Sequence, residues 1–101
     1  LVPGMVLLNE PGYYRAYEFG IRIENLVAVV PSASLVNAER EMMEFDALTI
    51  ISMDKRLVDK SLLSEAEVNW FNAYHALVFK TISPLMQGED LAWLTEVTQA
   101  I

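Results

Sequence analysis

The chain has 101 residues, enough for one domain with a modest core, and 53% of them are hydrophobic, so apolar side chains should remain at the surface and mark an interface. A net charge of −7 would repel phosphate backbones and argues against a nucleic-acid partner. No apolar run reaches the length of a membrane span, and the absence of cysteine excludes disulfide and thiolate chemistry.

The first half of the chain predicts antiparallel strands joined by turns. Residues 5–8 are a short apolar run between Pro-Gly pairs, which predicts a buried strand. Residues 11–19, with three tyrosines and a phenylalanine, are predicted to form a long loop. Residues 20–30 predict the longest strand, covered on both sides in its apolar second half. Pro31 should end it before a surface connection over 31–43.

Within residues 20–30, the alternation of a strand assigns side chains to two faces. Arg22 and Glu24 should share one face, and Ile21 and Ile23 should pack the opposite face against a core. Residues 44–52 alternate in the same way and predict a third strand.

The second half predicts a polar link and two helices. The link begins at residue 54 and is expected to be held down by Leu57, Leu62 and Leu63. Ser64 and Glu67 form a capping box that should start a helix, and Pro84 should end it near residue 82. Its apolar face should comprise Val68, Phe71, Tyr74 or His75, Val78, Ile82 and Leu85. A shorter helix is predicted over residues 89–100, and no internal repeat is expected.

Two glutamates are candidates for chemistry. Glu10 stands at a turn, and Glu24 follows 14 positions later inside the predicted strand. Two carboxylates on neighbouring strands could converge, but like charges repel unless a proton or a cation lies between them. Carboxylate oxygens suit manganese, and zinc also accepts them. A pair of glutamates is a weak signal, and two unrelated surface acids are the alternative.

Two motifs contain these glutamates: Asn-Glu-Pro-Gly-Tyr-Tyr at 9–14 and Phe-Gly-Ile-Arg-Ile-Glu-Asn at 19–25. In wording and spacing they resemble aminopeptidase P (Xaa-Pro aminopeptidase), a pita-bread metallopeptidase. Residues 72–75 and 89–94 resemble the C-terminal extension of that family. The resemblance implies an α+β fold, in which residues 1–40 are the final antiparallel strands of a pita-bread catalytic domain. Residues 41–101 would be the extension, with one strand and two helices.

The resemblance also implies a site and an activity. The family holds two divalent metal ions, typically manganese with zinc and cobalt as alternatives, by two aspartates, one histidine and two glutamates. Glu10 matches the glutamate that binds one ion, and Glu24 matches the glutamate that bridges both. Arg22 and Tyr14 match residues that support the site through hydrogen bonds. The implied activity is removal of an N-terminal residue that precedes proline.

Several family residues have no counterpart here. The two aspartates, the ligand histidine and the catalytic histidine would lie upstream of Leu1, so we expect a C-terminal piece that is inactive alone and binds metal weakly. His75 does not replace them, because a lone histidine in the middle of a helix is usually structural or solvated. At the tip of the predicted loop, Tyr17 stands where the family often has a small turn residue.

The expected partners are a peptide with proline at its second position, the missing N-terminal part of the same protein, and a second copy in a homodimer. The expected location is the cytoplasm, because a chain without cysteine fits a reducing compartment. Neither a membrane nor a nucleic acid is expected as a partner. Two alternatives stay open: a pita-bread dipeptidase that cleaves Xaa-Pro, and a structural, dimer-forming module without chemistry of its own.

Overall fold

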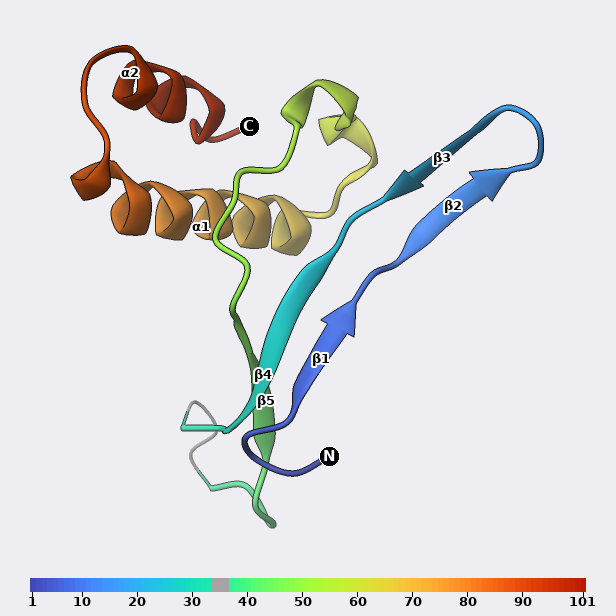
Figure 1. Ribbon diagram of the computed structural model, residues 1–101. Helices are drawn as coiled ribbons and strands as arrows, with labels where there is room; N and C mark the ends of the chain where they lie inside the picture. Colours follow the sequence, from blue (N-terminus) through green and yellow to red (C-terminus); the bar gives the residue numbers. More distant parts are fainter. Residues whose placement is uncertain (34–36) are drawn as a thin grey trace. The chain divides into compact units, whose positions relative to one another are not determined.

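The computed structural model describes residues 1–33 and 37–101, and it divides into two compact units, residues 1–49 and residues 50–101. Part of the connection predicted over 31–43 therefore lies outside the described residues. The α+β prediction is confirmed, because strands form the first unit and helices form the second (Figure 1).

The first unit is a long antiparallel hairpin that carries a third strand. Strand β1 (Val6–Asn9) pairs with β4 (Asn25–Pro31), β2 (Gly12–Arg15) pairs with β3 (Phe19–Arg22), and β5 (Met43–Ala47) pairs with the other edge of β4. The two sheets have the strand orders β1-β4-β5 and β2-β3. Figure 1 shows β2 and β3 continuing outward from β1 and β4 as one arm.

The prediction of a loop over residues 11–19 was wrong, since β2 and β3 form a hairpin there. The Glu18 N–H donates to the Arg15 carbonyl at 3.1 Å and closes the turn. Tyr17 has a φ of 62°, which explains why a small residue suits this position. The single strand predicted over 20–30 is two strands, because residues 23 and 24 are not paired in either ladder.

Among the described residues of the first unit, the fully buried side chains lie on one face of β4. Asn25, Val27 and Val29 are buried, whereas the residues between them are half-buried or exposed, so β4 is not covered on both sides. Ile21 and Ile23 were predicted to pack against a core but are 46% and 49% exposed. The reason is that β2 and β3 pair with each other in a separate two-stranded sheet and not with the three-stranded sheet that contains the buried face of β4.

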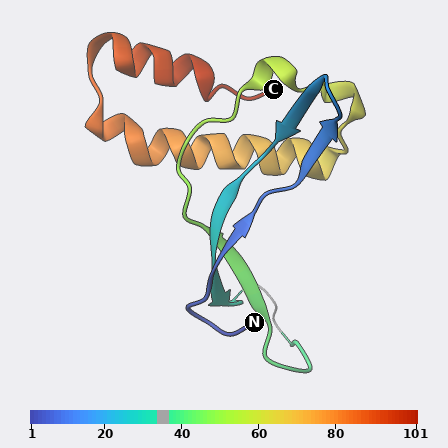
Figure 2. The ribbon, with the colours of Figure 1, turned by 45° about the vertical axis from the view of Figure 1, so that its right-hand side comes forward.

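The second unit contains two helices joined by one short 3₁₀ segment. Helix α1 spans Glu65–Ile82, η3 spans Ser83–Leu85 and α2 spans Gly88–Val97, and Figure 2 shows α2 alongside α1. The predicted capping box is present: the Ser64 hydroxyl accepts from the Glu67 N–H, and Glu67 accepts from the Ser64 N–H at 2.8 Å. Pro84 follows the end of α1 as predicted. Neither helix is long and apolar enough to cross a membrane.

In this unit, fewer residues of the predicted apolar helix face are buried than expected. Phe71, Tyr74, His75, Val78 and Leu94 are buried. Leu85, assigned to the same face, is 80% exposed, because the chain leaves the helix before reaching it. The third strand, predicted over 44–52, ends at Ala47.

Two consecutive five-residue segments, Asp54–Val58 and Asp59–Leu63, have the sequences Asp-Lys-Arg-Leu-Val and Asp-Lys-Ser-Leu-Leu. Each forms the same turn, η1 (Lys55–Leu57) and η2 (Lys60–Leu62), in which the aspartate accepts from the N–H two residues later. The expectation of no internal repeat was therefore wrong. In this turn the leucine points outward, so Leu57 and Leu62 are 74% and 81% exposed and do not hold the link down as predicted.

Candidate metal-binding site in the hairpin

The arm of the first unit is interrupted between its two ladders. Asn9 pairs with Asn25 before the interruption, and Gly12 pairs with Arg22 after it. Two residues on each strand separate these pairs, so the register does not change and Glu10 lies opposite Glu24. The Ile23 N–H donates to the Pro11 carbonyl at 3.1 Å, which holds the two strands together inside the interruption.

The guanidinium of Arg22 lies between the two carboxylates. Arg22 Nη1 is 3.6 Å from Glu10 Oε2, and Arg22 Nη2 is 3.2 Å from Glu24 Oε2. The alternation of a strand predicts that residues 22 and 24 share a face, and cross-strand partners share a face as well. The structure therefore brings together the three charged side chains that the sequence singled out. All three are 40–51% exposed, so the cluster is reachable from solvent.

Tyr14 lies on the same face, two residues beyond Gly12. Its cross-strand partner is Gly20. A Cβ atom placed on Gly12 would lie 2.7 Å from the Tyr14 hydroxyl oxygen, and one placed on Gly20 would lie 2.7 Å from Cδ1 of the same ring. The ring therefore lies along the hairpin over both glycines, with its hydroxyl toward the Arg22 end.

This set of groups has the donor chemistry of part of a metal site. Carboxylate oxygens on Glu10 and Glu24 bind divalent ions, and the arginine offsets their mutual repulsion. Across residues 1–33 and 37–101, no group of three histidine or acidic side chains is placed to hold a metal ion. Glu10 and Glu24 therefore fit a divalent metal ion only as two ligands of a set that needs further residues.

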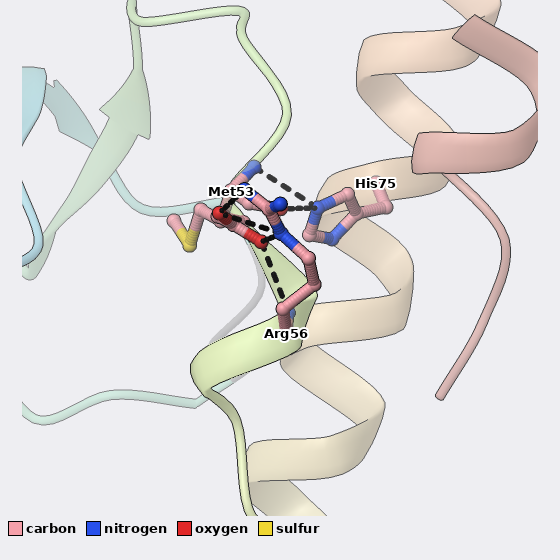
Figure 3. Close-up of polar contacts among 4 residues, drawn as sticks. Met53, Arg56 and His75 are labelled. Carbon is pink, nitrogen blue, oxygen red and sulfur yellow. Dashed lines mark hydrogen bonds and ion pairs between the residues drawn. The ribbon is translucent and has the colours of Figure 1, made fainter. Parts of the chain in front are cut away.

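In the second unit, His75 is fully buried and has a structural environment (Figure 3). The Met53 N–H donates to Nε2 at 3.1 Å, which assigns the ring proton to Nδ1, and Nδ1 donates to the Phe71 carbonyl at 2.9 Å. Both ring nitrogens are thus bonded to backbone, so of the two expected possibilities, a structural or a solvated histidine, the structure shows the structural one.

Next to Met53, Asp54 and Arg56 form a tight exposed ion pair (Figure 3). Arg56 Nη2 is 2.6 Å from Asp54 Oδ2, and the Arg56 N–H donates to Oδ1 at 3.0 Å. Hydrogen bonds from the Arg56 side chain and backbone lower the pKa of Asp54 to about 2. The pair fixes the η1 turn and lies in the unit that does not contain the glutamates.

Comparison with known families decides the relationship. The sequence model of Peptidase_M24_C, described as the C-terminal region of peptidase_M24, matches residues 41–101. The chain belongs to this peptidase M24 family. The match begins just before β5 and includes both helices of the second unit.

The relatives of this M24 chain are aminopeptidases. It is 43% identical over 101 residues to Aminopeptidase P2 of Arabidopsis thaliana, covering 97% of this chain and 14% of that protein. It is 38% identical over 106 residues to Xaa-Pro aminopeptidase ApepP of Drosophila melanogaster, covering 100% of this chain and 17% of that protein. The chain thus spans about a sixth of the length of the relatives it matches.

A solved aminopeptidase structure has the same fold over the length of this chain. The X-prolyl aminopeptidase from Caenorhabditis elegans, described as a cytosolic enzyme with a di-nuclear active site, superposes with a TM-score of 0.90 at 38% identity. The match covers 100% of this chain and 17% of that one. The predicted family resemblance and the predicted pita-bread origin of the strands are both confirmed.

Proposed function

We propose that this chain is the C-terminal part of a dinuclear-metal Xaa-Pro aminopeptidase, and that Glu10 and Glu24 are two of its metal ligands. The observation that carries the proposal is the opposed pair of carboxylates held around Arg22, 3.6 Å and 3.2 Å from its nitrogens. The di-nuclear site of the C. elegans enzyme supports the number of ions. The substrate would be a peptide with proline at its second position, as the names of the relatives suggest.

The residues of this chain would contribute charge and orientation. Glu10 and Glu24 would hold the ions, which we propose are manganese, through their carboxylate oxygens. Bound divalent ions would supply a nucleophilic water at neutral pH and stabilise negative charge in the transition state. Arg22 would aim both carboxylates by its paired N–H groups, and Tyr14 would support Arg22 from the same face. The remaining ligands would come from residues outside this chain.

The two parts of the chain would have different roles. Residues 1–40 would complete the catalytic domain, and residues 41–101 would form the extension. Trp70 and Trp93 in the extension are 54% and 53% exposed, which favours a homodimer contact there. The same contact suggests the second candidate function, in which the chain is an association module that contributes no chemistry. A cytosolic location is proposed by analogy with the C. elegans enzyme.

The test uses the complete protein that contains this chain. Glu10→Gln and Glu24→Gln remove one carboxylate charge each, and Glu18→Gln is the control, because Glu18 pairs with Arg15 at 3.0 Å outside the cluster. Bound manganese is measured by elemental analysis, and cleavage is measured on an Xaa-Pro peptide. Each of the first two variants should lose metal and lose activity by at least about 100-fold, exceeding the effect of changing a residue that only supports a ligand. Full metal content in both would contradict the proposal.

Residues 1–101 alone should bind manganese weakly and release no residue from an Xaa-Pro peptide. Calorimetry and sedimentation of this piece separate the two candidate functions. Metal binding that Glu24→Ala abolishes supports the metal site, whereas a dimer that is indifferent to manganese supports the association module.

A further inference from the structure

Gly12 and Gly20 leave open the space that the ring of Tyr14 occupies. An added Cβ on Gly12 would lie 2.7 Å from the hydroxyl oxygen and 2.9 Å from Cζ of Tyr14, and an added Cβ on Gly20 would lie 2.7 Å from Cδ1 and 3.1 Å from Cε1. Real Cβ atoms do not approach other atoms below 3.0 Å. The base of the ring therefore lies over Gly20 and its tip over Gly12.

Backbone conformation does not explain these two glycines. Among the described residues, the glycines with positive φ are Gly4 and Gly88, so Gly12 and Gly20 have dihedral angles that any residue can adopt. Glycine weakens a strand and often marks a place where another group approaches the backbone closely. At both positions the approaching group is the same side chain, Tyr14.

We propose that Gly12 and Gly20 are positioning residues that keep the Tyr14 ring flat along the hairpin and direct its hydroxyl toward Arg22. Gly12 is the cross-strand partner of Arg22, so a ring tip over Gly12 lies beside the residue that holds Glu10 and Glu24. An alanine at either position would lift the ring off the strands. The packing of the Tyr14 ring over the two glycines is supported by the distances given above. Only the effect of this packing on metal binding rests on the proposed function.

The first experiment observes the ring itself. The complete protein is prepared with 3-fluorotyrosine at position 14, and its ¹⁹F resonance is recorded in Gly12→Ala, Gly20→Ala and Gly4→Ala. The first two substitutions should shift the resonance. Gly4→Ala is the matched control, because its methyl meets nothing within 4 Å although its φ of +89° makes the substitution strained. A resonance that is unchanged in Gly12→Ala and Gly20→Ala overturns the proposal.

The second experiment measures coupling through Tyr14. Manganese affinity of the complete protein should fall about 10-fold in Gly20→Ala, as is typical for residues that orient a ligand. In a Tyr14→Ala background the same substitution should cause no further loss, because the ring that it displaces is gone. An equal loss in both backgrounds overturns the proposal. A shifted resonance with manganese affinity unchanged even in Glu24→Gln supports the packing and instead contradicts the proposed function.

Discussion

The backbone N–H of Met53 donates to Nε2 of His75 at 3.1 Å, which fastens the segment before η1 to the middle of α1 (Figure 3). His75 is fully buried, and the hydrogen bond that it accepts from Met53 is partly buried. Tyr74, the next residue toward the N-terminus, donates its hydroxyl to the Ile51 carbonyl at 2.9 Å. Adjacent residues of one helix thus satisfy two backbone groups of the same extended segment.

Replacing His75 by phenylalanine should destabilise the protein by about 1–2 kcal/mol, because the partly buried Met53 N–H loses its acceptor. Thermal or denaturant unfolding of the second unit measures the effect. Asn69→Phe, on the exposed side of the same helix, is the control and should change stability by less than about 0.5 kcal/mol. Equal stability of the two variants would show that the bond contributes nothing.

The first turn of α1 should loosen in acid. Hydrogen bonds from the backbone N–H and hydroxyl of Ser64 lower the pKa of Glu67 below its ordinary value of 4.5. Because the pKa is lower in the folded state, this contribution is complete above the unfolded value and is lost as the pH falls through the folded value. The protection of the amides of residues 64–68, expressed relative to the intrinsic exchange rate at each pH, should fall as the pH drops below 4.5. In Glu67→Gln that acid-dependent change should be absent.

Asp54 should remain ionised to about pH 2, because the Arg56 side chain and N–H donate to its carboxylate. Arg56→Ala removes the side-chain bonds, and the pKa of Asp54 should rise toward 3.8. A carboxyl-carbon NMR titration measures both values. Arg40→Ala, in the other unit, serves as the control and should leave the titration unchanged.

Replacing Tyr17 by glycine should stabilise the β2–β3 hairpin by about 0.5–1 kcal/mol, because a side chain at a φ of 62° crowds the backbone. Ala16→Gly is the matched control one residue earlier. The φ of Ala16 is not positive, so there glycine should destabilise by about 0.4–1 kcal/mol by increasing the freedom of the unfolded chain. Thermal unfolding of both variants gives the comparison, and a shift of the same sign in both would contradict this explanation.

The sequence predicted α1 well because its ends are encoded locally. Ser64 and Glu67 start the helix by bonding each other's backbone, and Pro84 removes a donor just after its end. The β2–β3 hairpin was missed because its turn has Tyr17 at the left-handed position, where glycine or asparagine would have been a recognisable signal. The available clue was the presence of strand-favouring aromatic residues on both sides of that turn, Tyr13 and Tyr14 before it and Phe19 after it.

The candidate site was predicted only in part, because one of its relationships is local to a single strand and the other depends on how two strands pair. That Arg22 and Glu24 share a face follows from one strand alone. Glu10 faces Glu24 only because the two strands pair in a particular register. This register continues into the β2–β3 hairpin, which was predicted from the sequence to be a loop. The part played by Gly12 and Gly20 was not predicted, although two glycines on one face beside a tyrosine are a readable pattern.

The pairing register is the same on both sides of the interruption. Glu10 therefore lies opposite Glu24 only if the number of residues between them is kept. Deleting one residue of the β2–β3 turn would slide one strand by a step, and a step reverses which side of the ribbon a side chain occupies. One acidic group would then be carried to the far side, away from its counterpart and from the guanidinium. The tip of the hairpin therefore determines whether the two proposed ligands lie on the same side of the hairpin.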